Sequence, residues 1–285
     1  MRRLIINADD FGLTSGVNLA IAKSSWCGAI TSATIMANGP AFSEAVTLAT
    51  TTPQLKTGCH VVLTDGQSVA SSLPSLADRR GRFRKSLLDF AGAAVSKRLV
   101  AKEVQREAEA QIRRLQSAGI TLTHVDSHKH THMFPQVLRP VLQAARACGI
   151  RAVRNPFEPV RSWPMRVVAS TPGLWLRAAG VATFQWFARE FRRAIQEERM
   201  RTTDGTVGIA ATGKLDQGML LAILDALPEG TWELVCHPGY ADADLRATGT
   251  RLVESRQVEL DALMSEATKE AVASRNIELI SYADL

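Results

Sequence analysis

The sequence is poor in cysteine. It has only four in 285 residues, at Cys27, Cys59, Cys148 and Cys236, and no two of them form a CxxC pair or enclose a short loop. Small secreted domains that depend on disulfides carry a denser and more regular set of cysteines. We therefore expect reduced, mostly buried thiols and a cytoplasmic protein.

The sequence also lacks a long apolar run and the usual glycine-based catalytic motifs. Its N-terminal apolar run stops after three residues and meets Asp9 and Asp10, and the least polar later stretch, 175–188, is interrupted by arginine and glutamine. Neither stretch fits a signal peptide or a membrane span. Gly213 and Lys214 lack the spacing of a phosphate-binding loop, and there is no GxSxG nucleophile motif.

The remaining composition is that of a folded protein. Hydrophobic residues make up 46% and charged residues 22%, which excludes a disordered chain. Lys and Arg exceed Asp and Glu by 34 to 28, a formal charge of +6 that leaves nucleic acid or an anionic surface open as a partner without favouring either. The length fits one or two domains, or a single barrel of about 250 residues.

Short β-rich runs alternate with segments of helical periodicity along most of the chain. This pattern is typical of βα units around a parallel sheet. Glycines at 28, 119 and 149 end three of the helical segments. We therefore predict an α/β fold, a TIM-barrel-like (β/α)7-8 barrel with a helical insertion, as a single domain over 1–285. The strands are expected at 3–7, 30–36, 56–63, 121–125, 151–154, 206–211, 232–236 and 277–281.

Two segments, at about 65–97 and 155–204, interrupt this alternation. The first is a polar connection rich in serine and arginine, and its basic stretch 79–85 is expected to be a solvated, turn-rich loop. The second holds seven of the sixteen aromatic residues, interleaved with arginines. It is interpreted as a helical excursion with its own small core, a subunit interface, or a lid over a ligand cleft.

The histidines are few but concentrated. Four of the six lie within nine residues, in the run Thr123-His124-Val125-Asp126-Ser127-His128-Lys129-His130-Thr131-His132. Alternate side chains of a strand share a face, so these histidines and Asp126 project together for as long as the strand continues. The apolar residues on either side predict that the strand ends inside the run. Asp126 and His128 are then near its C-terminal end, where barrels build active sites.

Other predicted strands end in acids or imidazoles as well. The first ends at Asp9 and Asp10, a later one carries His60 at or near its end, and His237 directly follows another. The C-terminal ends of parallel strands meet at one rim. Imidazoles and carboxylates there are ordinary ligands of a divalent metal, and hydrolysis is the obvious use of such a site.

A purely structural interpretation stands beside this one. A single histidine at a strand end is more often a hydrogen-bonded structural residue, and an aspartate there often caps the next helix. For His60 alone the structural role is favoured. The coincidence of four such strand ends on one rim favours the metal site.

Four of these segments in combination resemble the YdjC-like carbohydrate deacetylases, a family that includes chitooligosaccharide deacetylases and deacetylases of hopanoid glycolipid synthesis. The resemblance runs from Arg3 to the C-terminus. The segments are Asn7-Ala8-Asp9-Asp10-Phe11-Gly12-Leu13, Gly58-Cys59-His60 with Leu63-Thr64, the run from Thr123 to Met133, and Cys236-His237-Pro238-Gly239-Tyr240.

The resemblance implies a barrel-like fold that binds one divalent ion, Mg²⁺ or Zn²⁺, and hydrolyses the N-acetyl group of an amino sugar. By position, Asp10, His60 and His128 would be the metal ligands and Asp9 the catalytic base. The residues alone do not divide these roles between Asp9 and Asp10. Neighbours in an extended chain face opposite sides, so both reach one site only if the backbone turns, which Gly12 makes plausible.

Further roles follow from the charges of the reaction. His237 is the candidate acid that protonates the leaving amine, with a structural role in the turn at Pro238 as the alternative. Asp126 is placed to hydrogen-bond a ligand imidazole or the acid. His130 and His132 are expected to lie behind the ligands, to touch the substrate or to lie at the surface, and we expect one of them to contact the site.

The expected substrate is an acetylated amino sugar, as an oligosaccharide or a glycolipid, and the resemblance implies a homodimer. Two alternatives remain open. One is a metal-dependent hydrolase of another bond, such as a phosphoester. The other is a basic nucleic-acid-binding protein, which we disfavour because no such motif is present and we expect no nucleic-acid partner.

Overall fold

A computed structural model describes residues 1–159, 162–163 and 173–285 of the chain. The described residues form one parallel sheet whose strands lie close to all eight predicted positions, so the α/β prediction is confirmed. The strands are β1 (Arg2–Phe11), β2 (Ser32–Ile35), β3 (Lys56–Val61), β4 (Leu122–Ser127), β5 (Ala152–Val153), β6 (Gly205–Val207), β7 (Gly230–Cys236) and β8 (Ile277–Ile280).

The sheet is centred on β1, which pairs with three strands. The strand order is β5-β4-β3-β2-β1-β7-β6, and β8 pairs with β1 outside this path. β7 follows β1 from Arg2 to Ala8, so β8 and β2 share the opposite edge. β8 takes the first half of that edge, from Arg2 to Ile5, and β2 takes the second half. The chain that follows β8 is thereby brought to the inside of the curled sheet.

The prediction of a barrel needs one correction, because the ladder of strands does not close. The gap lies between β5 and β6, where the described residues contribute one isolated bridge, Ala152 to Arg201, and a hydrogen bond of 3.1 Å from the Thr206 N–H to the Phe157 carbonyl. β5 has only two residues, too few for a continuous ladder with β6. The sheet is therefore curled and TIM-barrel-like without being a closed ring.

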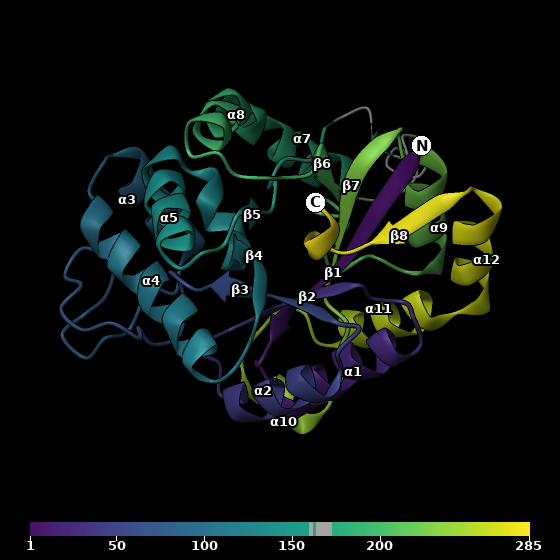
Figure 1. Cartoon of the computed structure of the whole chain (residues 1–285), viewed down its shortest axis with the longest axis horizontal. Coiled ribbons are helices and arrows are strands. Elements are labelled where there is room, and N and C mark those ends of the chain that lie inside the picture. The colour runs from purple at the N-terminus through teal and green to yellow at the C-terminus, as the bar shows by residue number, and fades with distance from the viewer. Residues whose placement is uncertain (160–161, 164–172) are drawn as a thin grey trace.

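Helices surround the sheet on its outside, and the C-terminus lies near the middle of their ring (Figure 1). The α-helices are α1 (Ser15–Trp26), α2 (Phe42–Thr51), α3 (Leu87–Val95), α4 (Ala101–Ser117), α5 (Pro135–Ala147), α7 (Leu174–Thr183), α8 (Ala188–Glu197), α9 (Gln217–Ala226), α10 (Ala243–Ala247), α11 (Glu254–Met264) and α12 (Glu266–Ser274). Short 3₁₀ segments are η1 (His128–Met133), η3 (Phe184–Phe187) and η4 (Tyr282–Asp284).

Local sequence signals explain where several helices begin and end. The hydroxyl of Thr14 accepts the Val17 N–H at the start of α1, and the carboxylate of Asp216 does the same for Met219 at the start of α9. The predicted stops at Gly28, Gly119 and Gly149 all have positive φ, between 72° and 86°. These backbone conformations favour glycine, which ends each helix and releases the chain into the next strand.

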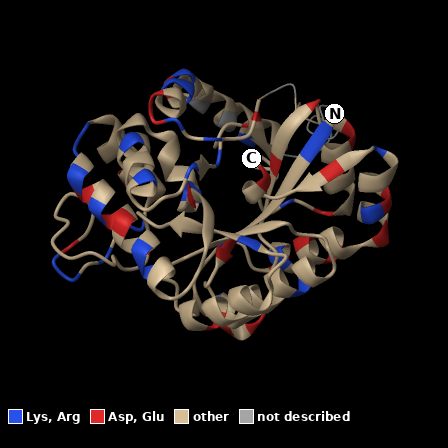
Figure 2. Cartoon of the chain, viewed as in Figure 1, with Lys and Arg blue, Asp and Glu red and all other residues tan. Residues whose placement is uncertain are grey.

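Acidic and basic residues alternate along the outer helix α4 (Figure 2), as the sequence predicts for a solvated face. Glu107 is an exception, because it is fully buried. Its carboxylate accepts the backbone N–H groups of Val69 and Ala70, at 2.9 and 2.8 Å. Glu103 similarly holds the N–H of Ser75 at 2.8 Å. These two glutamates anchor to α4 the part of the first segment that precedes the basic stretch 79–85.

The second segment, 155–204, is partly helical. It contains α7, η3 and α8, while residues 160–161 and 164–172 lie outside the described residues. Phe157 and Phe191 pack edge to face, with ring centroids 5.6 Å apart. All four cysteines are free thiols, and within the described ranges no helix is long and apolar enough to cross a membrane.

Candidate metal and catalytic site

The C-terminal ends of β1, β3, β4 and β7 bring the predicted site residues together. β1 supplies Asp9 and Asp10, β3 supplies His60, and the end of β4 supplies Asp126 and His128. His237 directly follows β7. All of these side chains are buried except that of His128, which is 21% exposed. The rim that the sequence predicts therefore exists, and it carries acids and imidazoles packed against one another.

A local irregularity in β1 turns both neighbouring aspartates toward the site. Asp10 has a φ of 65°, in the left-handed region, and the register of β1 against β2 shifts between Ala8 and Phe11. Bulges of this kind re-aim side chains, and aspartate is among the few residues that tolerate this backbone conformation. The turn was expected near Gly12, and it begins two residues earlier, at Asp10 itself.

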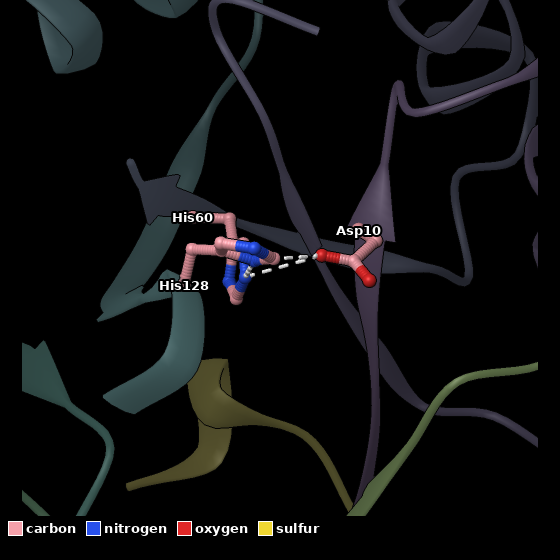
Figure 3. A group of neighbouring side chains, drawn as sticks. All are labelled: Asp10, His60 and His128. Carbon is pink, nitrogen blue, oxygen red and sulfur yellow. Dashed lines mark hydrogen bonds and ion pairs between the residues drawn. The ribbon is translucent and has the colours of Figure 1, made fainter. Parts of the chain in front are cut away.

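The side chains of Asp10, His60 and His128 point toward one another (Figure 3), and their ligand atoms all lie within 4.8 Å of one another. Oδ1 of Asp10 is 3.1 Å from Nδ1 of His128 and 3.5 Å from Nε2 of His60, and the two imidazole nitrogens are 3.3 Å apart. Ligand atoms bound at about 2.1 Å to one ion lie about 3.0–3.4 Å from each other. Two imidazoles and one carboxylate at this spacing fit a single divalent ion.

His60 is held with one nitrogen toward this group and the other toward a carboxylate. Its Nδ1 lies 2.7 Å from Oδ1 of Asp126, which accepts the Nδ1–H and leaves Nε2 facing Asp10 and His128. Burial by itself would lower the pKa of His60, but Asp126 and Asp9 raise that pKa to about 10. The same negative potential that holds a proton here favours a bound cation.

Arg154 lies behind the site and was missed by the sequence analysis. Its fully buried guanidinium is 2.6 Å from an oxygen of Asp9, 2.6 Å from Asp126 and 2.7 Å from Glu233. A second possible metal group, Asp9 with His60 and Asp126, is therefore already balanced by the arginine. The available signal was a charged residue at the end of the predicted strand 151–154 and another inside the apolar strand 232–236.

Asp9 is fixed in its ionised form. Burial alone would raise its pKa, but the Arg154 guanidinium holds the pKa of Asp9 well below the usual range. The side-chain amide of Asn7 also donates to Oδ1 of Asp9 at 3.0 Å. Oδ2 of Asp9 faces His237, with 3.9 Å between Oδ2 and Nε2. At the rim, the carboxylate of Asp9 and the imidazole of His237 therefore face each other.

α11 lies behind His237 and Asp10 and carries two further residues that the sequence analysis missed. Arg256 donates through Nη2 to Oδ2 of Asp10, and Glu259 accepts the backbone N–H of His237 at 2.6 Å. Burial lowers the pKa of His237 to about 4, against the opposing charges of Asp9 and Asp10. Burial also raises the pKa of Glu259 to about 7.

The remaining histidines of the run have different surroundings. β4 ends at Ser127, inside the run as predicted, and His130 follows with a φ of 53°. Nδ1 of His130 is buried and has no hydrogen-bond partner within 1–159, 162–163 and 173–285. His132 instead lies 2.6 Å from the Ser127 hydroxyl and 3.1 Å from the Arg154 carbonyl, so it supports the backbone that carries Arg154. His124 lies deeper, with Nε2 3.1 Å from the side-chain oxygen of Asn7.

A family model described as YdjC-like protein matches residues 3–274. The chain belongs to the YdjC-like family. Family members similar to it include a carbohydrate deacetylase from Brevibacillus brevis, 33% identical over 99% of both chains. A chitooligosaccharide deacetylase from Klebsiella pneumoniae is 35% identical and covers 100% of this chain and 99% of its own.

Solved structures show the same fold for the YdjC-like chain. One is described as a proposed cellobiose-phosphate cleavage protein from Enterococcus faecalis, with a TM-score of 0.80 and 26% identity over 99% of this chain and 98% of that one. A second is a lactam utilization protein from Thermus thermophilus, with a TM-score of 0.50, 14% identity and coverage of 98% and 99%. The second likeness concerns the fold alone.

Proposed function

We propose that the protein is a metal-dependent carbohydrate N-deacetylase, which hydrolyses the N-acetyl group of an acetylated amino sugar and releases acetate. The observation that carries the proposal is the Asp10, His60 and His128 group with Asp9 and His237 beside it. Two family members of almost equal length, from Brevibacillus brevis and Klebsiella pneumoniae, are named as deacetylases of this kind, which supports the same chemistry here.

The residues that would hold the metal are Asp10, His60 and His128, around one divalent ion, Mg²⁺ or Zn²⁺. When bound, the ion supplies Lewis-acid polarisation of water and of the amide carbonyl. Asp126 keeps the Nδ1–H of His60 engaged, so that Nε2 is free to ligate. Arg256 occupies Oδ2 of Asp10 and leaves its Oδ1 for the ion.

Asp9 is the proposed base. Its Oδ2 takes one proton from the attacking water while the water oxygen forms a bond to the acetyl carbon. Arg154 keeps this carboxylate ionised and in place, so it is ready to accept a proton and returns it easily. His237, 3.9 Å from Oδ2, is the proposed acid. It gives a proton to the sugar nitrogen as the carbon–nitrogen bond breaks and the bonding electrons leave with nitrogen, and the products are acetate and the free amine.

His130 is the proposed substrate contact among the histidines that follow the ligands. Its left-handed backbone turns it out of the line of β4, and its Nδ1 has no hydrogen-bond partner in the part of the chain that the structure describes. Burial lowers its pKa to about 3, so the imidazole is neutral and can both donate to and accept from sugar hydroxyls.

Acetate release from a panel of substrates tests the function. The panel contains N-acetylated mono-, di- and oligosaccharides and glucosaminyl lipids, with phosphoesters assayed in parallel for phosphate. We expect acetate release that requires Mg²⁺ or Zn²⁺ and that is lost in Asp9→Asn and His128→Ala. Asp261→Asn, an exposed aspartate of α11, is the matched control. Phosphate release without acetate release, or activity that survives both substitutions, would contradict the proposal.

We further propose that residues 1–285 form one deacetylase domain and that it works as a homodimer. The family model, which spans 3–274, supports the first part. Large exposed apolar side chains on α7 and η3, which are Trp175, Leu176 and Trp186, support a surface that is covered in solution. Sedimentation of the wild type is expected to give twice the chain mass of 31.0 kDa. Trp186→Glu is expected to shift the measured mass toward that of a single chain. A monomeric wild type would contradict the dimer.

A further inference from the structure

α11 places two buried charges three residues apart behind the site. Arg256 and Glu259 are both only 1% exposed. Arg256 contacts Asp10, which is itself a proposed metal ligand. Glu259 contacts the backbone of His237, the proposed acid. A charge buried this deeply is costly unless it has partners or a function.

The contact of Glu259 with His237 has two parts. Oε2 accepts the backbone N–H of His237 at 2.6 Å, and the same oxygen lies 3.8 Å from Nδ1 of the imidazole. Nδ1 of His237 and Oε1 of Glu259 are both buried without a hydrogen-bond partner among the described residues, as is Nη1 of Arg256. Buried polar atoms are almost always satisfied, and a single bound water can serve two to four of them.

We propose that Glu259 is a positioning residue that fixes the tautomer of His237. This inference rests on the proposed function of His237 as the acid. Two carboxylates face the ring, and both can only accept. The oxygens of Asp9 already accept from Arg154 at 2.6 and 2.8 Å, whereas Oε1 of Glu259 has no hydrogen-bond partner among the described residues. The Nδ1–H of the imidazole is therefore held toward Glu259, directly or through one water. Nε2 then carries its lone pair toward Oδ2 of Asp9, where the proton taken from water is held.

The opposite tautomer is disfavoured by the same geometry. It would put the lone pair of Nδ1 against the Glu259 carboxylate and leave Nε2 with a hydrogen. An Nε2 that already carries hydrogen in the neutral ring cannot pick up a proton for delivery to the sugar nitrogen. Glu259 therefore decides whether His237 can take a proton and pass it on, without touching the substrate itself.

Nitrogen NMR of protein labelled at histidine tests the tautomer without any substrate. The spectra are recorded at about pH 8, roughly one unit above the pKa of about 7 for Glu259, with and without Mg²⁺. We expect the Nδ1–H form of His237 in wild type and its loss in Glu259→Gln. Glu254→Gln, an exposed position of the same helix, is the control and should match wild type. An unchanged tautomer in Glu259→Gln overturns the proposal.

A kinetic cycle separates positioning from simple packing. With an N-acetylglucosamine disaccharide, Glu259→Gln is expected to lower kcat about 10–100-fold, with KM and bound metal unchanged. In the His237→Ala background the same change should cost nothing further, because the residue it acts through is gone. A full additional loss in that background overturns the proposal.

Two further results keep the test decisive. If Glu259→Gln fails to fold, Glu259→Asp, which keeps the charge, must retain the Nδ1–H tautomer, and its loss there counts against the proposal. If wild type releases no acetate, the deacetylase function is wrong, while the NMR spectra still decide whether Glu259 sets the tautomer of His237.

Discussion

Arg154 holds both oxygens of Asp9, with Nη2 2.6 Å from Oδ1 and Nη1 2.8 Å from Oδ2, and its guanidinium is wholly buried. A two-pronged contact of this kind fixes the carboxylate in orientation as well as charge. The same guanidinium also meets Asp126 and Glu233. One cation thus connects the proposed base, the carboxylate behind His60 and the strand that leads to His237.

Arg154→Lys is expected to keep the positive charge but lose the two-pronged contact, because lysine presents a single ammonium. Asp9 is then freed to rotate, and kcat should fall by at least about tenfold. Arg154→Met takes the guanidinium away from three buried carboxylates and should lower the free energy of unfolding by about 3–5 kcal/mol. Acetate assays and urea unfolding measure the two effects. The exposed neighbour Arg151→Lys is the control, and equal behaviour of both lysine variants would contradict the assignment.

The strands and the rim were predictable from sequence because each rests on a local signal. Apolar runs as long as a β-strand end at or next to Asp9, His60 and His237. The C-terminal ends of parallel strands necessarily share one edge of the sheet. The end of β4 inside the histidine run was predictable in the same way, from the change in residue type on either side of it.

The residues behind the site were not predictable, because their partners are distant in the chain. Arg256 meets Asp10 across 246 positions and Arg154 meets Asp9 across 145, and no local pattern marks either contact. The prediction of a barrel needed correction for a related reason. β5 has only two residues, and no local pattern in the predicted strand 151–154 marks so short a strand.

The positive φ of Asp10 allows a direct test of how the two aspartates divide their roles. Asparagine tolerates the left-handed backbone, so Asp10→Asn keeps the bulge and removes only the anionic ligand. We expect metal affinity to fall by at least about tenfold in this variant. Asp9→Asn should instead keep its metal and lose acetate release. Calorimetry of Mg²⁺ and Zn²⁺ binding checks the pair, and metal loss in Asp9→Asn alone would reverse the assignment.

The C-terminal segment reaches the same network from the inner side of the sheet. The hydroxyl of Tyr282 donates to Glu233, and its ring stacks on His124 with centroids 3.8 Å apart. Burial raises the pKa of Tyr282 well above its usual value, so it acts as a neutral donor. Through Glu233 and Arg154 this donor supports the carboxylate of Asp9.

Tyr282→Phe keeps the stacked ring and removes only this donor. We expect a loss of about 1–3 kcal/mol in the free energy of unfolding, the usual cost of an unsatisfied buried acceptor. Tyr282→Leu, which also removes the stack, should cost more. Urea unfolding of the two variants gives the comparison. A phenylalanine variant as stable as wild type would show that Glu233 does not depend on the hydroxyl.

His124 makes the stability of the folded protein depend on pH in the acidic range. Burial lowers its pKa to about 3 from a usual value of 6.5, so the folded protein keeps it neutral while the unfolded chain protonates it. Above pH 6.5 His124 is neutral in both the folded and the unfolded chain, so it costs the folded state no stability there. As the pH falls from 6.5 toward 3, unfolding takes up a proton and stability drops by about 1.4 kcal/mol per pH unit.

His124→Gln removes this titration while keeping an N–H donor for the side-chain oxygen of Asn7. The lost stack on Tyr282 lowers stability by a similar amount at every pH, so the slope with pH is the informative quantity. Urea unfolding is measured at about pH 7.5, 6.5 and 5.5. Between about pH 6.5 and 5.5 the loss of stability should be smaller than in wild type by roughly 1 kcal/mol, because the unfolded histidine is already half protonated at pH 6.5. The slope that remains belongs to other buried groups such as His132, whose pKa burial lowers to about 4. Identical slopes in the two proteins would mean that His124 is already protonated, or exposed, in the folded state.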